Sequence, residues 1–165
     1  LTPGPFNQAK AEKRQDVLCY TTAPLDSDLE VTGPIKVHLC AATSARDTDF
    51  VAKLVDVYPD GDAFNVVEGI IRARFRHGLV NPSLVTPGEV QDYVIDLASV
   101  SIVFRKGHRM RLDITSSNFP RFDRNMNTGN PFGEDAEGLI AEQTVFHDEG
   151  HASYVELPIM RTGTL

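Results

Sequence analysis

The sequence predicts an all-β fold, a sandwich or barrel built from about nine or ten short strands. Apolar residues alternate with polar ones over short runs; at 109–115, for example, Met110, Leu112 and Ile114 alternate with charged residues. Turn-forming residues separate these runs at intervals of about 8 to 12 residues. No segment shows the apolar spacing of a long amphipathic helix. The 165 residues suit a single domain.

We place the strands, in chain order, at residues 17–22, 29–33, 35–43, 48–59, 63–69, 70–75, 90–98, 102–115, 139–148 and 153–160. The run at 48–59 is apolar on both faces, which is typical of a central strand. Asp60 and Gly61 follow it and predict a hairpin. Residues 77–89 are polar and proline-rich, so they predict a loop.

Residues 1–15 combine Pro-Gly-Pro with a short charged stretch, and they predict a linker or extended arm before a sandwich domain at 16–165. The chain opens on Leu1 rather than Met, which is compatible with a fragment or a processed product. The sequence has no signal-peptide pattern and no apolar run of the roughly 20 residues that a membrane-spanning helix needs. We therefore expect no membrane partner, and a cytoplasmic location.

The balance of charge is acidic, with 16 Lys and Arg against 23 Asp and Glu. A net charge of −7 argues against nucleic acid as a partner, because such binding depends on neutralising phosphates. Two basic stretches, 72–76 and 105–111, carry their charges at alternate positions. We expect those charges on the outer face of strands, in solvent or beside acidic neighbours. The sequence is compatible with an oligomer but does not predict one.

Cys19 and Cys40 lie within apolar, strand-like runs. We interpret them as two buried free thiols rather than a disulfide, which agrees with a reducing compartment. Without a CxxC spacing they predict no zinc site.

No residue of the chain stands out as catalytic. The G-x-S-x-G motif of α/β-hydrolases is absent. Ser116, Ser117 and His108, with Asp113 or Asp123, could form a triad only by folding together, and nothing marks either serine as a nucleophile.

Metal ligands and cofactors are not predicted either. The aspartates at 26–30, 47–49 and 60–62 are more typical of turns than of a calcium loop. His147 and His151 have a ligand-like spacing, but they fall in a predicted loop, where solvated side chains are expected.

The loop after the strand at 109–115, "SSNFPRFDRNMNTG" at 116–129, holds two phenylalanines among turn formers and charges. Phe119 and Phe122 flank Pro120, and three charged residues surround them. Rigid aromatic side chains ringed by charge are typical of an interface anchor. Equally, both rings could fill the end of the domain's own core, with the charges capping them.

Longer strings carry a resemblance to a known family. "DVLCYTTAPLDSDLEVTGPIKVHLCAATSARDTDFVAKLVDVYPDG", "GIIRARFR", "FRKGHRMRLDITSSNFPRFDRNMNTG" and "HASYVELPIM" occur in that order over about residues 16–160. They resemble the C-terminal β domain of the X-Pro dipeptidyl-peptidase and cocaine esterase family of serine hydrolases.

The resemblance implies a jelly-roll β-sandwich of the galactose-binding type that follows an α/β-hydrolase domain. In the family the Ser, Asp and His of the triad belong to that hydrolase domain, and none of the three maps onto this chain. We therefore expect an accessory domain that packs on the catalytic domain as its partner, with no triad and no cofactor of its own.

The resemblance leads us to place an interdomain surface, or the rim of the substrate cleft, on two loops. Its predicted residues are Asp47, Asp49, Phe50, Phe119, Arg121, Phe122, Asp123 and Arg124. A carbohydrate-binding module is the alternative function, although sugar platforms usually present Trp and this chain has none. A stand-alone hydrolase is the third, and the missing nucleophile motif argues against it.

Overall fold

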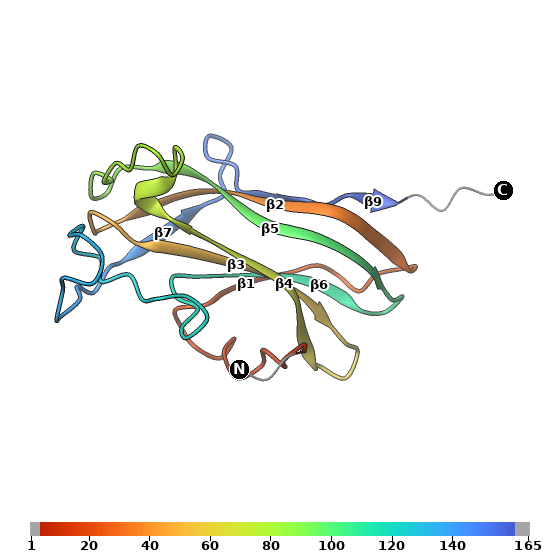
Figure 1. Cartoon of the computed structure of the whole chain (residues 1–165). Coiled ribbons are helices and arrows are strands. Elements are labelled where there is room, and N and C mark those ends of the chain that lie inside the picture. The colour runs from red at the N-terminus through yellow and green to blue at the C-terminus, as the bar shows by residue number, and fades with distance from the viewer. Residues whose placement is uncertain (1–3, 161–165) are drawn as a thin grey trace.

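The computed structural model describes residues 4–160, which form two antiparallel β-sheets packed face to face (Figure 1). The strands are β1 (Leu18–Thr21), β2 (Leu29–Thr43), β3 (Asp49–Val57), β4 (Ala63–Arg72), β5 (Gln91–Phe104), β6 (Arg109–Thr115), β7 (Gln143–Phe146), β8 (Tyr154–Glu156) and β9 (Ile159–Met160). One sheet has the order β1-β6-β3-β4. The other has β2 between β5 and the three short strands β7, β8 and β9. The predicted all-β class is confirmed.

The central position of the run at 48–59 is also confirmed. β3 lies between β6 and β4, and eight of its nine residues are buried. The hairpin at Asp60 and Gly61 joins β3 to β4. Gly61 adopts a φ of 97°, which residues other than glycine disfavour because of their Cβ atom. The Tyr58 amide closes the turn by donating to the Asp62 carbonyl at 2.8 Å.

Several predicted strand boundaries were wrong. Residues 63–72 form the single strand β4, residues 139–142 lie in a loop before β7, and the segment 153–160 is divided between β8 and β9. Residues 29–33 and 35–43 form the single strand β2, because the sheet absorbs Gly33-Pro34 at a register shift opposite Ala98, whose φ is 63°. Residues 73–75 form a 3₁₀ turn rather than the end of a strand. The segment 102–115 is divided between β5 and β6, with Lys106 and Gly107 in the turn between them.

The core fills the space between the sheets. Its largest fully buried side chains include Tyr93, Phe50, Phe104, Ile35 and Leu54. Tyr93 and Phe50 come from different sheets, and their ring centroids lie 4.7 Å apart. The domain therefore has a hydrophobic centre of its own.

On one side, β4 and β5 close the sandwich. Gly69 of β4 lies so near β5 that a Cβ at this position would stand 2.2 Å from the carbonyl oxygen of Asp96. Only glycine permits this approach of the two sheets.

Residues 6–12 lie against the sheet of β1, β6, β3 and β4. Asn7 forms a β-bridge with Phe64, and the Gln8 amide donates to the Ala63 carbonyl at 2.7 Å. Glu12 forms an ion pair with Arg111 of β6 at 2.5 Å. The predicted linker thus contacts the sandwich, while the domain boundary at residue 16 stays a prediction.

The two cysteines are free, as predicted, but they differ in burial. Cys40 is buried, whereas Cys19 lies on the edge strand β1 and is exposed, so that part of the prediction was wrong. None of the helices in residues 4–160 has the length and apolar character to cross a membrane.

Candidate functional site

The two predicted loops meet at one end of the sandwich, which we call the loop end. It is formed by the β2–β3 loop (44–48), the β4–β5 loop (73–90) and the β6–β7 loop (116–142), at the left of Figure 1. Because these connections leave the same end of neighbouring strands, side chains distant in sequence become neighbours there.

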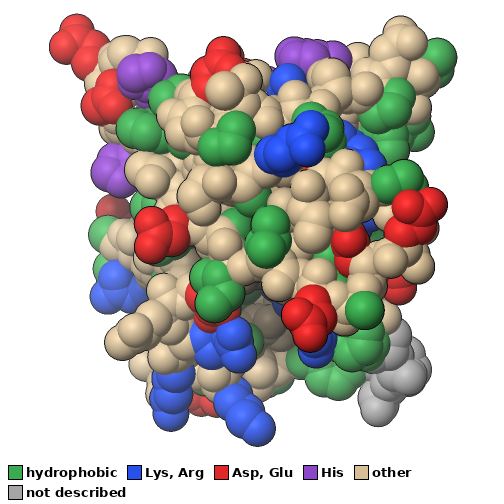
Figure 2. Space-filling model, turned by 90° about the vertical axis from the view of Figure 1, so that its left-hand side faces the viewer, with side chains coloured by type: hydrophobic (Ala, Val, Ile, Leu, Met, Phe, Trp, Pro, Cys, Tyr) green, Lys and Arg blue, Asp and Glu red, His purple; other side chains and the backbone are tan. Residues whose placement is uncertain are grey.

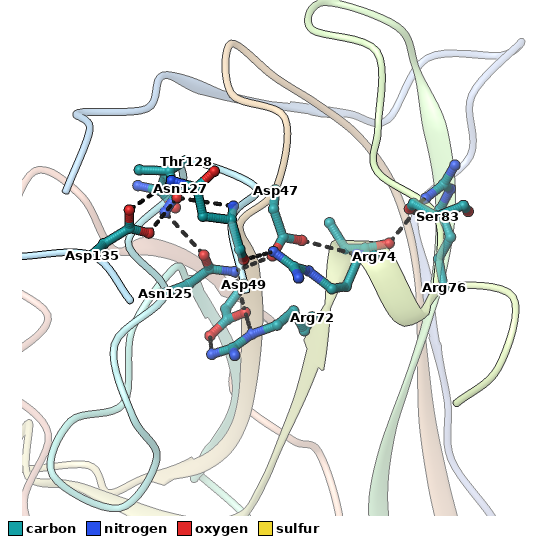
Figure 3. Close-up of polar contacts among 12 residues, drawn as sticks. Asp47, Asp49, Arg72, Arg74, Arg76, Ser83, Asn125, Asn127, Thr128 and Asp135 are labelled. Carbon is teal, nitrogen blue, oxygen red and sulfur yellow. Dashed lines mark hydrogen bonds and ion pairs between the residues drawn. The ribbon is translucent and has the colours of Figure 1, made fainter. Parts of the chain in front are cut away.

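Two buried ion pairs lie beneath the loop end (Figure 3). The guanidinium of Arg72 donates to both carboxylate oxygens of Asp49, at 2.7 and 2.9 Å. Arg74 donates to Asp47 through its backbone amide at 2.9 Å and its Nε at 2.8 Å. The hydrogen bond with Asp49 raises the pKa of Arg72 above its already high ordinary value. Each arginine therefore has an aspartate partner, and charge-assisted hydrogen bonds join the two members of each pair.

Asn125 ties the long β6–β7 loop to these pairs. Its amide nitrogen donates to Asp47 at 3.0 Å and to Asp49 at 2.9 Å. Arg74 reaches further along the same loop, to the Asn130 carbonyl at 2.9 Å. The loop is thus held by buried charge at two points rather than lying free on the surface.

Phe132 covers the pairs from outside. Its ring centroid lies 4.8 Å from the guanidinium carbons of both Arg72 and Arg74. The contacts satisfy the geometry of cation–π attraction, and the ring keeps water from one face of each guanidinium. Phe132 is nevertheless exposed on its outer side.

The predicted aromatic pair occupies the same loop. Phe119 is 58% exposed, and the Arg124 guanidinium lies 4.8 Å from its ring centroid. Phe122 is partly buried, with Arg121 above its ring at 5.6 Å. Arg121 also forms an ion pair with Glu68 of β4 at 2.5 Å. The two interpretations of this loop therefore divide between the rings, because Phe119 is exposed whereas Phe122 is partly buried.

The predicted rim needs correction at three positions. Asp47 and Asp49 are buried and hold the loops together from beneath. Phe50, at 1% exposure, belongs to the core. β3 begins at Asp49, and its burial on both faces leaves Phe50 no route to the surface. Asp123 and Arg124, like Phe119 and Arg121, are exposed. Contact of these four with another domain stays a prediction.

Sequence reasoning missed other apolar side chains at this end. Leu79 and Val80 project from the β4–β5 loop, and Leu139 and Ile140 from the β6–β7 loop, all of them exposed. Figure 2 shows hydrophobic side chains scattered among charged ones over this end. For Leu79 and Val80 the signal was available, because both are apolar within the predicted loop at 77–89. Leu139 and Ile140 were missed because they fall in the strand predicted at 139–148, whereas β7 begins only at Gln143.

The residues considered for catalysis do not come together. His108 precedes β6 and the two serines follow it, so the seven-residue strand separates them by roughly 20 Å. His108 instead hydrogen-bonds Asp56 at 2.9 Å. The basic stretch 72–76 does pair with acidic neighbours as predicted, although Arg74 lies in the 3₁₀ turn rather than on a strand face.

In the part of the chain that the structure describes, no three His, Cys, Asp or Glu side chains lie close enough together to bind a metal ion. His151 contacts Asp148 at 3.1 Å, and His147 packs edge-on against Tyr20. The loop end presents exposed aromatic and charged side chains on loops that ion pairs hold in place, an arrangement suited to recognition.

Comparison with known proteins places this geometry in context. The cocaine esterase of Rhodococcus sp. (strain MB1 Bresler) is 44% identical over 96% of this chain, which corresponds to 28% of the esterase. An α-amino acid ester hydrolase structure superposes with a TM-score of 0.90 at 33% identity, over 94% of this chain and 27% of that one. An aminopeptidase from a marine sediment Thaumarchaeota archaeon gives a TM-score of 0.89 at 32% identity, with the same two coverages.

The chain thus spans less than a third of the length of each of these relatives. Residues 3–156 match the family model of the X-Pro dipeptidyl-peptidase C-terminal non-catalytic domain. That match covers nearly the whole chain and eight of the nine strands of the described residues, leaving out only β9. The chain belongs to this family, the C-terminal non-catalytic domain of X-Pro dipeptidyl-peptidases and related hydrolases.

Proposed function

We propose that this chain is the accessory domain of an esterase or X-Pro dipeptidyl-peptidase, packing on the α/β-hydrolase catalytic domain and helping to shape its substrate cleft. Membership of the family supports the proposal, as does the small share of each relative that the domain occupies. The substrates of the complete enzyme belong to the same proposal: esters or X-Pro peptides.

The observation that carries the proposal is the combination of exposure and rigidity at the loop end. Phe119 is 58% exposed, yet its loop is held to the sandwich by Asn125 on the buried carboxylates of Asp47 and Asp49. A pre-ordered aromatic side chain loses little entropy on binding, so it suits an interface anchor. A loop that served only its own core would bury this ring.

Two finer assignments belong to the same proposal. The two-sheet sandwich supports a jelly roll of the galactose-binding type. The free thiols of Cys19 and Cys40 support a cytoplasmic, reducing location.

Phe119→Ala, measured by denaturant unfolding in two contexts, tests the docking. In the complete hydrolase we expect it to weaken the attachment of this domain by about 2 kcal/mol or more, the usual effect of an interface hot spot. In the isolated chain the loss should be much smaller, because an exposed ring gives up little burial.

Phe6→Ala is the matched control, since Phe6 is 46% exposed but belongs to the N-terminal segment, whose amide at Phe6 donates to Asn65 of β4, away from the predicted rim. It should change neither context by more than about 0.5 kcal/mol. A large loss from Phe119→Ala in the isolated chain would mean that Phe119 belongs to the domain's own core.

Activity gives a second test. The isolated chain should hydrolyse neither p-nitrophenyl acetate nor an X-Pro anilide. Turnover that disappears in Ser117→Ala would contradict the non-catalytic assignment. Calorimetry with galactosides should show no saturable binding at millimolar concentration, and a tighter isotherm would favour the carbohydrate-binding alternative.

A further inference from the structure

Opposite the contact of β4 with β5, the sandwich stays open. A groove runs between β1 and β6 on one side and β7 and β8 on the other, with a cavity of about 440 Å³ at its centre. Its walls are almost wholly apolar: Tyr20, Met110, Leu112, Val145, Val155 and Leu157. A neighbouring hollow of about 260 Å³ shares Ile114 and Val145 with it and extends past Leu18 to Ser116 and Ala141. The groove therefore leads to the loop end.

Leu18 and Tyr20 show that a cover is missing from this groove. In the antiparallel register Leu18 pairs with Ile114 and Tyr20 with Leu112, and both partners face the core. Leu18 and Tyr20 consequently point between the sheets. They are nevertheless 42% and 40% exposed. Inward-facing side chains of a complete sandwich would be covered from both sheets.

β1 lacks two of the devices that protect edge strands, charge and proline, and is protected only by its short length of four residues. Its sequence, Leu-Cys-Tyr-Thr, contains neither charge nor proline, and in the described residues it pairs with β6 alone. Asn7 and Gln8 cover the beginning of the β4 edge, at Ala63 and Phe64, and the edge strand β5 carries Asp92 and Asp96. Unprotected edge strands expose unpaired backbone groups that attract another chain.

We infer that this open groove is the docking site for an apolar segment of the hydrolase domain, which lies along β1 and inserts side chains between β1 and β8. The inference rests on the proposed function and assigns the surface by which the two domains meet. Since the domain makes up only 28% of the related esterase, most of such a chain lies outside it and must meet it on some face.

A chain segment fits the groove better than a small apolar ligand does. The groove is open along β1, where an extended segment would satisfy the free backbone N–H and C=O groups as well as fill the cavity. A few polar side chains also line it, among them His147, which Tyr20 meets edge-on at 6.0 Å. A mainly apolar surface with few charged groups is typical of the core of a protein interface. Because the groove continues to the loop end, the groove and the loop end together form one docking surface.

Leu18→Lys tests the inference, with Val94→Lys as its matched control. Val94 is 46% exposed and also lies on a strand, but the alternating burial of β5 points it outward. In the complete hydrolase Leu18→Lys should lower the unfolding midpoint of this domain by roughly 5 °C or more, and Val94→Lys should leave it unchanged. In the isolated chain both should shift it by less than about 2 °C, because the lysine can extend into solvent.

The other outcomes separate the inference from the proposed function. If Phe119→Ala loosens the domains and Leu18→Lys does not, the groove is not the docking site, although the accessory role stands. If neither variant has an effect in the complete hydrolase, the docking proposal fails as a whole. Equal losses from Leu18→Lys in both contexts would assign Leu18 to the domain's own stability and overturn the inference. An isolated chain that sediments as a dimer, and as a monomer after Leu18→Lys, would replace the hydrolase domain by a second copy.

Discussion

The two long sides of the sandwich are completed in different ways. On the β4–β5 side the sheets approach so closely that Gly69 leaves no room for a side chain beside Asp96. On the β1–β8 side a cavity of about 440 Å³ separates them, and the inward-facing Leu18 and Tyr20 remain exposed. Protein interiors are normally close-packed, so a gap of this size on one side indicates a surface shaped for a partner.

The difference shows how an accessory domain can fold on its own and still depend on its enzyme. The closed side and the core around Tyr93 and Phe50 supply the packing that the domain needs by itself. The open side and the loop end leave apolar side chains exposed, where a partner could cover them. The four predictions that follow test this difference between the closed side and the open side.

Gly69→Ala should break the closed side and have the largest effect. Its Cβ would stand 2.2 Å from the Asp96 carbonyl oxygen, and a backbone atom cannot turn aside as a flexible side chain can. Overpacking of this kind costs about 3 kcal/mol or more. Urea unfolding of the isolated chain measures it, with Gly150→Ala as the control, since the nearest atom to that Cβ belongs to the side chain of Asp148. A loss below about 1 kcal/mol would show that the two sheets can separate cheaply on this side as well.

Asp113→Asn should change stability in a pH-dependent way. Asp113 faces Cys19 of β1, Arg111 of β6 and Lys53 of β3, with Glu12 above it, and burial raises its pKa from 3.8 to about 6. The folded state then holds the proton more tightly than the unfolded one. Stability from this group is fully present below about pH 4 and is lost as the pH rises through about 6.

A difference of about 2 between the pKa values of Asp113 in the folded and unfolded states corresponds to roughly 3 kcal/mol of folding free energy. The asparagine variant, which cannot ionise, should therefore gain up to about that much relative to the native chain between pH 4 and pH 7. Denaturant unfolding at both values measures the gain. Asp28→Asn is the control, and the pH-dependent change in its stability relative to the native chain should have the opposite sign. Hydrogen bonds from the Lys106 amide and Arg105 lower, rather than raise, the pKa of that exposed carboxylate. If the free energies of unfolding of the native chain and Asp113→Asn differ by the same amount at pH 4 and pH 7, the raised pKa of Asp113 is contradicted.

Thiol labelling should sharpen the picture of β1 without changing stability. Cys19 is an exposed residue, but desolvation of its thiol against the sheet and a hydrogen bond with Asp113 raise its pKa to about 12, and burial raises that of Cys40 to about 11. Both should react slowly with iodoacetamide at pH 8, because the thiolate is the reactive form. Ser44→Cys, at an exposed loop position, should react much faster. Cys19 pairs with Asp113 on the outer face, so docking of a partner in the groove should leave its rate unchanged. Labelling of Cys19 as fast as Ser44→Cys would contradict the raised pKa of its thiol beside Asp113.

The sequence was a good guide wherever the structure is local. The burial of β3 and the hairpin at Asp60 and Gly61 follow from hydrophobic pattern and turn chemistry, which act over a few residues. The continuation of β2 through Gly33 and Pro34 could not be predicted, because it depends on a compensating irregularity at Ala98, more than sixty residues further along the chain.

The same limit explains the candidate site. The aromatic and charged loop at 116–129 could be recognised from composition, and so could its neighbour at 46–50. The burial of Phe50 and Asp47 depends on how β3 enters the core, which no local pattern reveals. The open groove was missed because the inward direction of Leu18 and Tyr20 is set by pairing with β6, more than ninety residues away.

Amide hydrogen exchange at β1 tests the central claim most directly. The exchange of Leu18–Thr21 is compared between the isolated chain and the complete hydrolase, with Ala63–Arg72 of the closed side as the internal reference. We predict that β1 exchanges roughly tenfold more slowly, or slower still, in the complete protein, while the exchange of β4 is unchanged. Equal exchange of β1 in the two contexts would show that the open side faces solvent in the enzyme as well, and would contradict the claim.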